Sequence, residues 1–261
     1  MIMLLAVDLR NKLVSIGLRN DKKAWVSTLN LAATDRSADE WRYLILSLLR
    51  EEGIQKTDLS RAILSSVVPS YTLRFKEALG ALLPPGKVPL LIGPGVRSGL
   101  RIRTDNPAEV GSDLVCTAVA ALHLVGSPCL VVDFGTALSF TALDSKGDMI
   151  GAAFAPGLDS SAEYLREKSA QPPQVRLDQP QAAIGKNTTE AIRSGLLLGW
   201  AGLVDRLVEE ISSELGAPGK KVYLVGTGAS KSCPIKTTRS FDLWEPALAL
   251  EGMALIDEMN Q

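Results

Sequence analysis

Short apolar runs, separated by polar turns, predict three consecutive strands at the start of the chain, an order typical of an antiparallel meander. These strands are expected at residues 3–8, 13–18 and 24–29. Ser37–Glu52 predicts a helix, because apolar residues recur there at helical spacing and Ser37 with Glu40 forms a capping box. A strand, a helix and a strand follow at 62–67, 71–83 and 88–92. The predicted order is therefore β-β-β-α-β-α-β.

A second series of the same kind starts at residue 129, where an apolar strand again ends on an aspartate, Asp133. Its strands are expected at 129–133, 137–143, 149–154 and 221–225, and its helices at 158–169, 188–215 and 247–259. Asp8 and Asp133 stand at equivalent points, 125 residues apart, which indicates a duplicated α/β unit. A strand that ends on aspartate and a turn also occurs in other α/β proteins. We expect two halves, 1–106 and 107–261, around a central cleft.

Composition and charge narrow the class of protein. The 261 residues are 46% apolar and 22% charged, a globular balance that excludes a disordered chain. With 28 Lys and Arg against 29 Asp and Glu, the net charge of -1 predicts no nucleic-acid partner and no anionic membrane partner. No apolar run approaches the roughly 20 residues of a membrane helix, and no signal-peptide pattern opens the sequence. The three cysteines show no disulfide or metal spacing, so we expect a cytoplasmic protein.

Two aspartates and two glycine-containing turns are the candidates for binding phosphate and a metal ion. Asp8 and Asp133 end the first strand of each half, where two opposed carboxylates could hold a hydrated Mg²⁺ with a polyphosphate. Gly135-Thr136 offers close backbone approach and a hydroxyl for a phosphate oxygen. Gly226-Thr227-Gly228 would let an adenosine lie against the backbone, and an ordinary strand-to-helix turn explains these glycines equally well.

Asp113 is the candidate base. Asp105-Asn106-Pro107 has the pattern of a helix start, and Asp113 then enters an otherwise apolar helix. A carboxylate near that start could accept a proton from a substrate hydroxyl that attacks a γ-phosphate, and in phosphoryl transfer such a group mainly orients the nucleophile. Alternatively, Asp113 merely favours the helix dipole.

Many segments, in order along the chain, resemble the type III pantothenate kinases, a family of the acetate/sugar kinase–Hsp70–actin superfamily. The resembling segments are 65–69, 93–96, 105–107, 109–111, 132–137, 155–157, 184–188, 194–195 and 250–252. The resemblance implies a duplicated ribonuclease H-like (actin-like ATPase) fold and ATP-dependent phosphorylation of pantothenate to 4'-phosphopantothenate, the first step of coenzyme A biosynthesis. It also implies Mg²⁺, a monovalent cation (K⁺ or NH₄⁺) and a homodimer formed through helices of the second half.

The resemblance also implies roles for single residues. The implied ATP and phosphate residues are Asp8, Asn11, Gly135, Thr136, Gly226, Thr227 and Gly228. Gly111, Asp113 and Thr188 would bind pantothenate, the last reaching the pocket of the partner subunit. Asp113 would be the catalytic base, and Asp8 and Asp133 would lie at the metal.

The sequence departs from the family pattern near these positions. The first phosphate loop of the family is Asp-x-Gly-Asn-Thr, and here Arg10 and Lys12 replace the glycine and the threonine; their charge could serve a phosphate instead. Leu114 replaces an arginine, Thr104 a tyrosine and Ala229 a glycine. We therefore favour a pantothenate kinase and retain two alternatives, a weak or inactive homologue with a binding or regulatory role and a kinase for another small hydroxyl compound.

Overall fold

The computed structural model describes residues 3–168, 175–216, 220–228 and 240–261. Contacts divide the chain into two compact units. The first comprises Met1–Leu100, Asp105–Ala120 and Leu248–Gln261, and the second comprises Arg101–Thr104 and Ala121–Ala247. Ala229, expected near the adenosine, lies outside the described residues.

The first unit contains a mixed five-stranded sheet of order β3-β2-β1-β4-β5. Its strands are β1 (Met3–Leu9), β2 (Leu13–Asn20), β3 (Trp25–Ala32), β4 (Leu59–Ser66) and β5 (Leu90–Leu91). The first three form an antiparallel meander, and β4 pairs in parallel with both β1 and β5. The meander that the sequence predicts is thereby confirmed.

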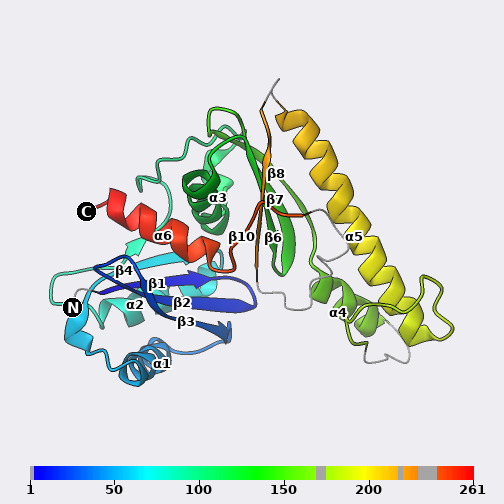
Figure 1. The fold of residues 1–261 in the computed structure, drawn as a ribbon. Helices are drawn as coiled ribbons and strands as arrows, with labels where there is room; N and C mark the ends of the chain where they lie inside the picture. The colour runs from blue at the N-terminus through cyan, green and yellow to red at the C-terminus, as the bar shows by residue number, and fades with distance from the viewer. Residues whose placement is uncertain (1–2, 169–174, 217–219, 229–239) are drawn as a thin grey trace. The chain divides into compact units, whose positions relative to one another are not determined.

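The first sheet is covered on both faces, which explains why every residue of β1 is buried. Met3, Leu5, Val7 and Leu9 point into a core with α1 (Ala38–Glu51) and α2 (Pro69–Gly80), where the rings of Trp41 and Phe75 lie 4.5 Å apart. The capping box predicted at Ser37 and Glu40 opens α1. Helix α6 (Leu248–Met259) contacts β1, β2 and β4 and lies on the other side of this sheet from α1 (Figure 1).

Helix α6 also makes a close backbone approach to α3 (Ser112–Val125). A Cβ added at Gly252 would overlap the carbonyl oxygen of Cys116. The preceding residue, Glu251, accepts a 2.6 Å hydrogen bond from the indole of Trp25 on β3. The segment 250–252 therefore serves packing of the first unit.

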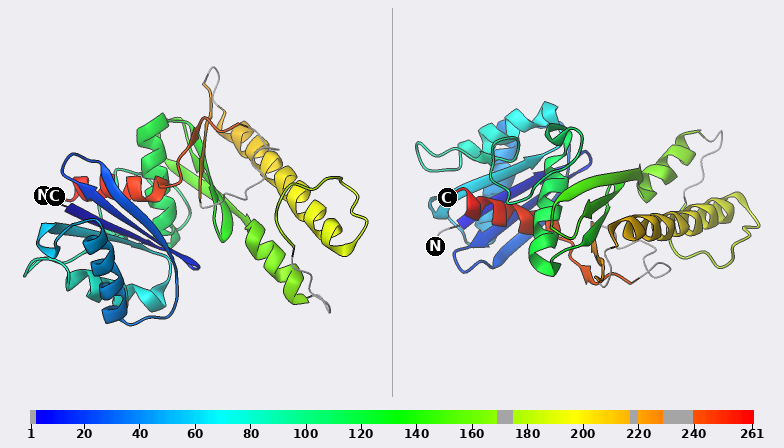
Figure 2. Two further views of the ribbon diagram at one scale, coloured as in Figure 1. Left: turned by 60° about the horizontal axis from the view of Figure 1, so that its bottom comes forward. Right: turned by 90° about the horizontal axis from the view of Figure 1, so that it is seen from above.

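The second unit contains a sheet of order β10-β9-β6-β7-β8. Its strands are β6 (Cys129–Phe134), β7 (Ala137–Leu143), β8 (Met149–Pro156), β9 (Tyr223–Thr227) and β10 (Leu243–Trp244). Helix α5 (Thr188–Leu215) packs on β6 and β7, and α4 (Leu158–Lys168) contacts α5 (Figure 2). Leu130, Val132 and Phe134 point toward Trp200 and Val204 of α5 in the core of this unit.

The two sheets have the same topology. In each, the first strand pairs antiparallel with the second and parallel with the fourth, and the short fifth strand extends the parallel side. The predicted duplicated α/β fold of ribonuclease H-like type is therefore confirmed.

Some boundaries differ from the prediction. Asn106-Pro107 opens only a 3-10 turn, η2 (Pro107–Glu109), because Val110 leaves the helical region, and α3 begins later, at Ser112. The strand β10 was not predicted, because two residues carry too little periodicity. The contacts group α6 with the first unit, because it packs on the first sheet, and so differ from the expected halves 1–106 and 107–261. Those halves stay a prediction about domains.

We predict that Gly252→Ala lowers the free energy of unfolding by about 1–3 kcal/mol, because the new methyl group forces α6 away from α3. Gly80→Ala at the end of α2 is the matched control, since a Cβ there meets only Pro89 at 3.9 Å, an ordinary contact, and its helix should lose no stability. Urea unfolding followed by circular dichroism measures both. Equal stability of Gly252→Ala and the wild type would contradict the close approach.

Candidate active site

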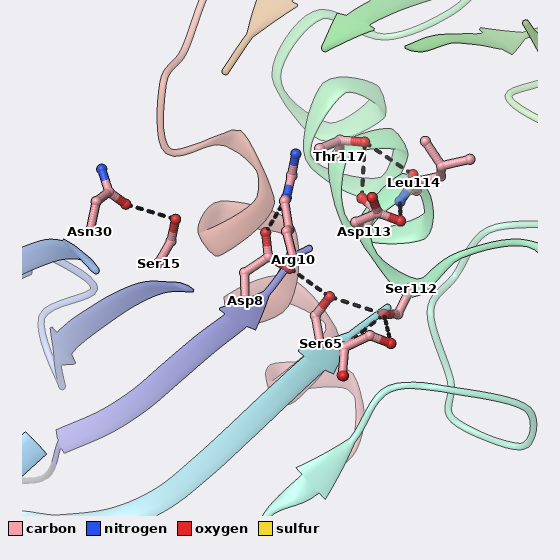
Figure 3. A network of polar contacts seen from close by, with 10 residues as sticks. Asp8, Arg10, Ser15, Asn30, Ser65, Ser112, Asp113, Leu114 and Thr117 are labelled. Atoms are coloured by element: carbon pink, nitrogen blue, oxygen red, sulfur yellow. Dashed lines mark hydrogen bonds and ion pairs between the residues drawn. The ribbon is translucent and has the colours of Figure 1, made fainter. Parts of the chain in front are cut away.

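Asp8 is a buried carboxylate at the end of β1. It is the penultimate residue of the strand, is 1% exposed and lies on the sheet face opposite the core of α1 and α2. Its Oδ2 forms an ion pair with the Nε of Arg10 at 2.7 Å, and its Oδ1 accepts a hydrogen bond from the hydroxyl of Ser65 at 2.8 Å (Figure 3). Both oxygens of a buried carboxylate are thus compensated.

The loop after β1 is a tight turn, in which the backbone N–H of Arg10 donates to the carbonyl of Leu13 at 2.8 Å. Lys23 is the only non-glycine residue of the described ranges with positive φ, so Arg10 occupies the family's glycine position without strain. Asn11 and Lys12 are exposed in this turn. The departure therefore adds a guanidinium beside Asp8 rather than a distorted backbone.

Asp113 lies in the first turn of α3, as predicted. Its Oδ1 accepts a 2.9 Å hydrogen bond from the backbone N–H of Leu114, which agrees with the helix-dipole alternative and leaves the role of a base open. Gly111 leaves room for the carboxylate, since a Cβ there would lie 2.5 Å from that oxygen. Leu114, in the family's arginine position, is 7% exposed.

Asp133 is the counterpart of Asp8 in the second unit. It is the penultimate residue of β6, is 4% exposed and lies on the sheet face opposite the core of α5. Its pairing partners are Ser139 on the antiparallel side and Thr227 on the parallel side, both buried. Thr227 thus lies beside Asp133 as the sequence places it, at the end of β9.

Two glycines brace the turn Gly135-Thr136. Gly157 donates its N–H to the carbonyl of Thr136 at 3.1 Å, and a Cβ on Gly157 would overlap the carbonyl of Gly135. Ser160 Oγ donates to the same Thr136 carbonyl at 2.9 Å. Gly228 has a φ of 108° and lies so close to the backbone of Phe134 that a Cβ there would overlap it. The turn is therefore held by residues that directly follow β8 and β9 and by Ser160 of α4, and the sequence alone predicted no such role for Gly157 or Ser160.

Gly226 has a packing role in this structure. It is buried in β9, and a Cβ there would overlap the ring of Trp244, which also lies 5.4 Å from the ring of Phe134. The indole thus covers the position that the sequence assigns to adenosine, and adenosine contact by Gly226 stays a prediction.

The two remaining predicted positions lie in the second unit. Thr188 is exposed at the start of α5, directly after the helix cap Asn187, whose side chain accepts from the N–H of Glu190 at 2.9 Å. Thr104 has a buried hydroxyl with no hydrogen-bond partner among the described residues.

The predicted residues thus fall into two groups. Asp8, Asn11, Gly111 and Asp113 belong to the first unit, and the remaining predicted residues belong to the second. Ser65 and Ser112, which join Asp8 to the start of α3, were missed; the pairing of Asp8 with Ser65 across β1 and β4 was the signal available. Within the described ranges, no group of three or more His, Cys, Asp or Glu could hold a metal, and no helix could cross a membrane.

Cys116 lies close to Asp8, and burial with that charge raises the pKa of its thiol well above the ordinary value. Burial alone raises the pKa of Cys129 to about 12.

We predict that both thiols resist alkylation at pH 8 in the folded protein, because thiolate is the reactive form and a raised pKa depletes it, for Cys129 by roughly 1,000-fold. Mass spectrometry of the two peptides after iodoacetamide treatment, with a urea-unfolded control, measures this. Equal labelling of folded and unfolded protein would refute the burial of these cysteines.

Comparison with known proteins identifies the chain. A sequence model of the family described as type III pantothenate kinase matches residues 4–210. The type III pantothenate kinase of Dehalococcoides mccartyi strain 195 is 39% identical over 258 residues, 99% of this chain and 98% of that protein. The Thermobifida fusca protein of the same name is 36% identical over 259 residues, 99% of this chain and 100% of that protein.

Among solved structures, the activator of the 2-hydroxyisocaproyl-CoA dehydratase from Clostridium difficile with bound ADPNP matches with a TM-score of 0.60. The identity is 12%, with 99% of this chain and 96% of that chain covered, so this likeness concerns the fold alone. The sequence matches, by contrast, extend over almost the whole chain. The chain therefore belongs to the type III pantothenate kinase family.

Proposed function

We propose that this protein transfers the γ-phosphate of ATP to pantothenate, giving 4'-phosphopantothenate in the first step of coenzyme A biosynthesis. The observation that carries the proposal is the 39% identity to a type III pantothenate kinase over 99% of the chain, which includes every proposed site residue. No feature of the described residues favours either alternative, so neither is proposed here.

Asp113 orients the attacking hydroxyl of pantothenate. Its carboxylate sits in the first turn of α3, in the room that the missing side chain of Gly111 leaves for it. Positioning dominates phosphoryl transfer, so a fixed acceptor for the hydroxyl proton is the main requirement. Thr188, exposed at the start of α5, completes the pantothenate pocket of a partner subunit.

The phosphates of ATP lie against the turn Gly135-Thr136 and the turn after β1. The turn Gly135-Thr136 is braced by residues that directly follow β8 and β9, and Thr136 is exposed and able to donate its hydroxyl to a phosphate oxygen. Asn11 lies in the corresponding turn after β1. Thr227 and Gly228 form the adenosine end, next to Gly226, which itself packs against Trp244. A protein of the same fold binds the ATP analogue ADPNP, which agrees with this use of the fold.

The residues also fit Mg²⁺. Mg²⁺ prefers one or two carboxylates with phosphate oxygens and retained waters, and Asp8 and Asp133 supply buried carboxylates at the ends of equivalent strands. One Asp8 oxygen accepts from Arg10 and the other from Ser65, and each has a second lone pair, so each can still accept from a metal-bound water. When bound, Mg²⁺ would neutralise charge that develops on the phosphates. Asp8 and Asp133 would hold it, and Arg10 would add positive charge for a phosphate oxygen.

Three further properties belong to this proposal through the family: a monovalent cation, K⁺ or NH₄⁺, a homodimer and a cytoplasmic location. The exposed glycines of α5 support the homodimer, because among the described residues a Cβ at Gly195, Gly199 or Gly202 would meet nothing within 4 Å beyond its own helix backbone. Such a surface permits close approach by a helix of a second copy.

The proposal is tested by ADP release coupled to NADH oxidation, with pantothenate, ATP, Mg²⁺ and K⁺. We expect turnover, and Asp113→Asn should lower kcat by about 10²- to 10⁴-fold while the fold is retained, because the hydroxyl loses its acceptor. Absence of turnover above the Asp113→Asn background would end the proposal. Turnover with another hydroxyl compound and none with pantothenate would reassign the substrate.

A second prediction concerns the braced turn. Gly157→Ala should raise the KM for ATP by about 10-fold or more, because the added methyl group displaces the backbone of Gly135 and Thr136. Gly151→Ala on the preceding strand β8 is the matched control, because a Cβ there meets no atom of the described residues within 4 Å. Steady-state kinetics with varied ATP decides, and equal KM values for the two variants would contradict a phosphate role of this turn.

A further inference from the structure

A chain of buried hydroxyl groups joins Asp8 to the start of α3. Ser65 Oγ lies 2.8 Å from Asp8 Oδ1 and 3.0 Å from Ser112 Oγ (Figure 3). Ser112 Oγ in turn accepts a 2.9 Å hydrogen bond from the backbone N–H of Ser66 and lies 3.2 Å from its carbonyl oxygen. Ser65 is 0% exposed and Ser112 is 8% exposed.

The donors of this chain are determined by counting hydrogens. A hydroxyl has one hydrogen, and the ionised Asp8 can only accept, so the hydrogen of Ser65 points to Asp8. The bond between the two hydroxyls is then donated by Ser112, which shares its hydrogen with the carbonyl of Ser66. The N–H of Ser66, the hydroxyl of Ser112 and the hydroxyl of Ser65 thus each donate to the next group toward Asp8, an arrangement in which each bond strengthens the next; only the share of the Ser112 hydrogen on the Ser66 carbonyl points elsewhere.

The strand register places both Ser65 and Ser15 beside Asp8, and of these two only Ser65 donates to its carboxylate. Asp8 pairs with Ser65 on the parallel side and with Ser15 on the antiparallel side. The hydroxyl of Ser15 donates to Asn30 Oδ1 at 2.7 Å, away from Asp8. In the second unit Thr227 pairs with Asp133 in the place of Ser65. Ser15 is thus a built-in control.

Ser112 also connects two elements of the first unit. It is the first residue of α3 and directly precedes Asp113. Its hydroxyl bonds to both backbone polar groups of Ser66, the last residue of β4. One side chain therefore ties the helix start that carries Asp113 to the strand beside Asp8.

We propose that Ser65 and Ser112 are positioning residues of the kinase: Ser65 orients the Asp8 carboxylate for Mg²⁺-nucleotide, and Ser112 couples that orientation to the placement of Asp113 for pantothenate. The proposal rests on the proposed function of Asp8 and Asp113. It separates the two serines, since loss of Ser65 affects the nucleotide site and loss of Ser112 affects both substrates.

The test is a calorimetric titration with a non-hydrolysable ATP analogue, with and without Mg²⁺. In the wild type we expect Mg²⁺ to tighten binding, and in Ser65→Ala this gain should fall by about 10-fold, as after loss of a hydrogen bond to a charged group. Asp8→Asn should abolish the gain, whereas Ser15→Ala should keep it. Ser65→Thr, which keeps the hydroxyl as Thr227 does, should retain most of it.

A second test compares the KM values of the variants for pantothenate and for ATP by steady-state kinetics. Ser112→Ala should raise the KM for pantothenate as well as for ATP, while Ser65→Ala should leave the pantothenate KM within about two-fold of the wild type. Thermal unfolding of each variant separates loss of fold from loss of positioning.

The inference is overturned if Mg²⁺ still increases the affinity for the ATP analogue in Ser65→Ala as it does in the wild type, but no longer does so in Asp8→Asn. That result would leave the proposed function intact. It is also overturned if Asp8→Asn keeps the gain, because Asp8 then has no metal role. Failure of the kinase proposal itself is a separate result, absence of turnover in the wild type.

Discussion

The site in the first unit depends on one constraint, the burial of a carboxylate at the end of a strand that is itself buried on both faces. Asp8 is 1% exposed, and an uncompensated charge there would cost several kcal/mol. Arg10 and Ser65 supply that compensation from the following turn and from the parallel neighbour β4. The ion pair and the hydroxyl chain therefore follow from the position of Asp8, and they orient its oxygens as well as stabilise them.

The second unit also has a buried carboxylate near the end of its first strand, but different residues surround it. Asp133 stands where Asp8 stands, but Thr227 occupies the parallel neighbour, and glycines surround the following turn. Gly157 and Gly228 press backbone against backbone at 134–136, which rigidifies the turn without side-chain bulk. In the first unit the corresponding turn carries Arg10 and Lys12. The duplicated fold thus holds one turn shaped by close backbone contact and one that carries charge.

Arg10 stands where the family has a glycine, and the structure shows what this replacement does to the turn. By sequence, Arg10 and Lys12 replace a glycine and a threonine of the family's first phosphate loop. The turn adopts backbone angles open to any residue, and the guanidinium pairs with Asp8 at 2.7 Å. Close backbone approach is still lost, so phosphate binding at this turn depends on side chains. Gly226 shows the opposite case, because a residue expected to approach a ligand approaches Trp244.

Apolar periodicity and strand-aspartate repetition in the sequence alone determined the meander, the long helices and the duplication, because burial on one or both faces imposes these patterns directly. The strand of two residues at Leu243-Trp244, the late start of α3 at Ser112 and the return of α6 to the first sheet were decided only in the folded chain. The same holds for the bonds from Ser112 through Ser65 to Asp8, which span 47 and 57 residues of sequence. Such contacts arise from strand register and packing between distant segments, and local sequence patterns carry no record of either.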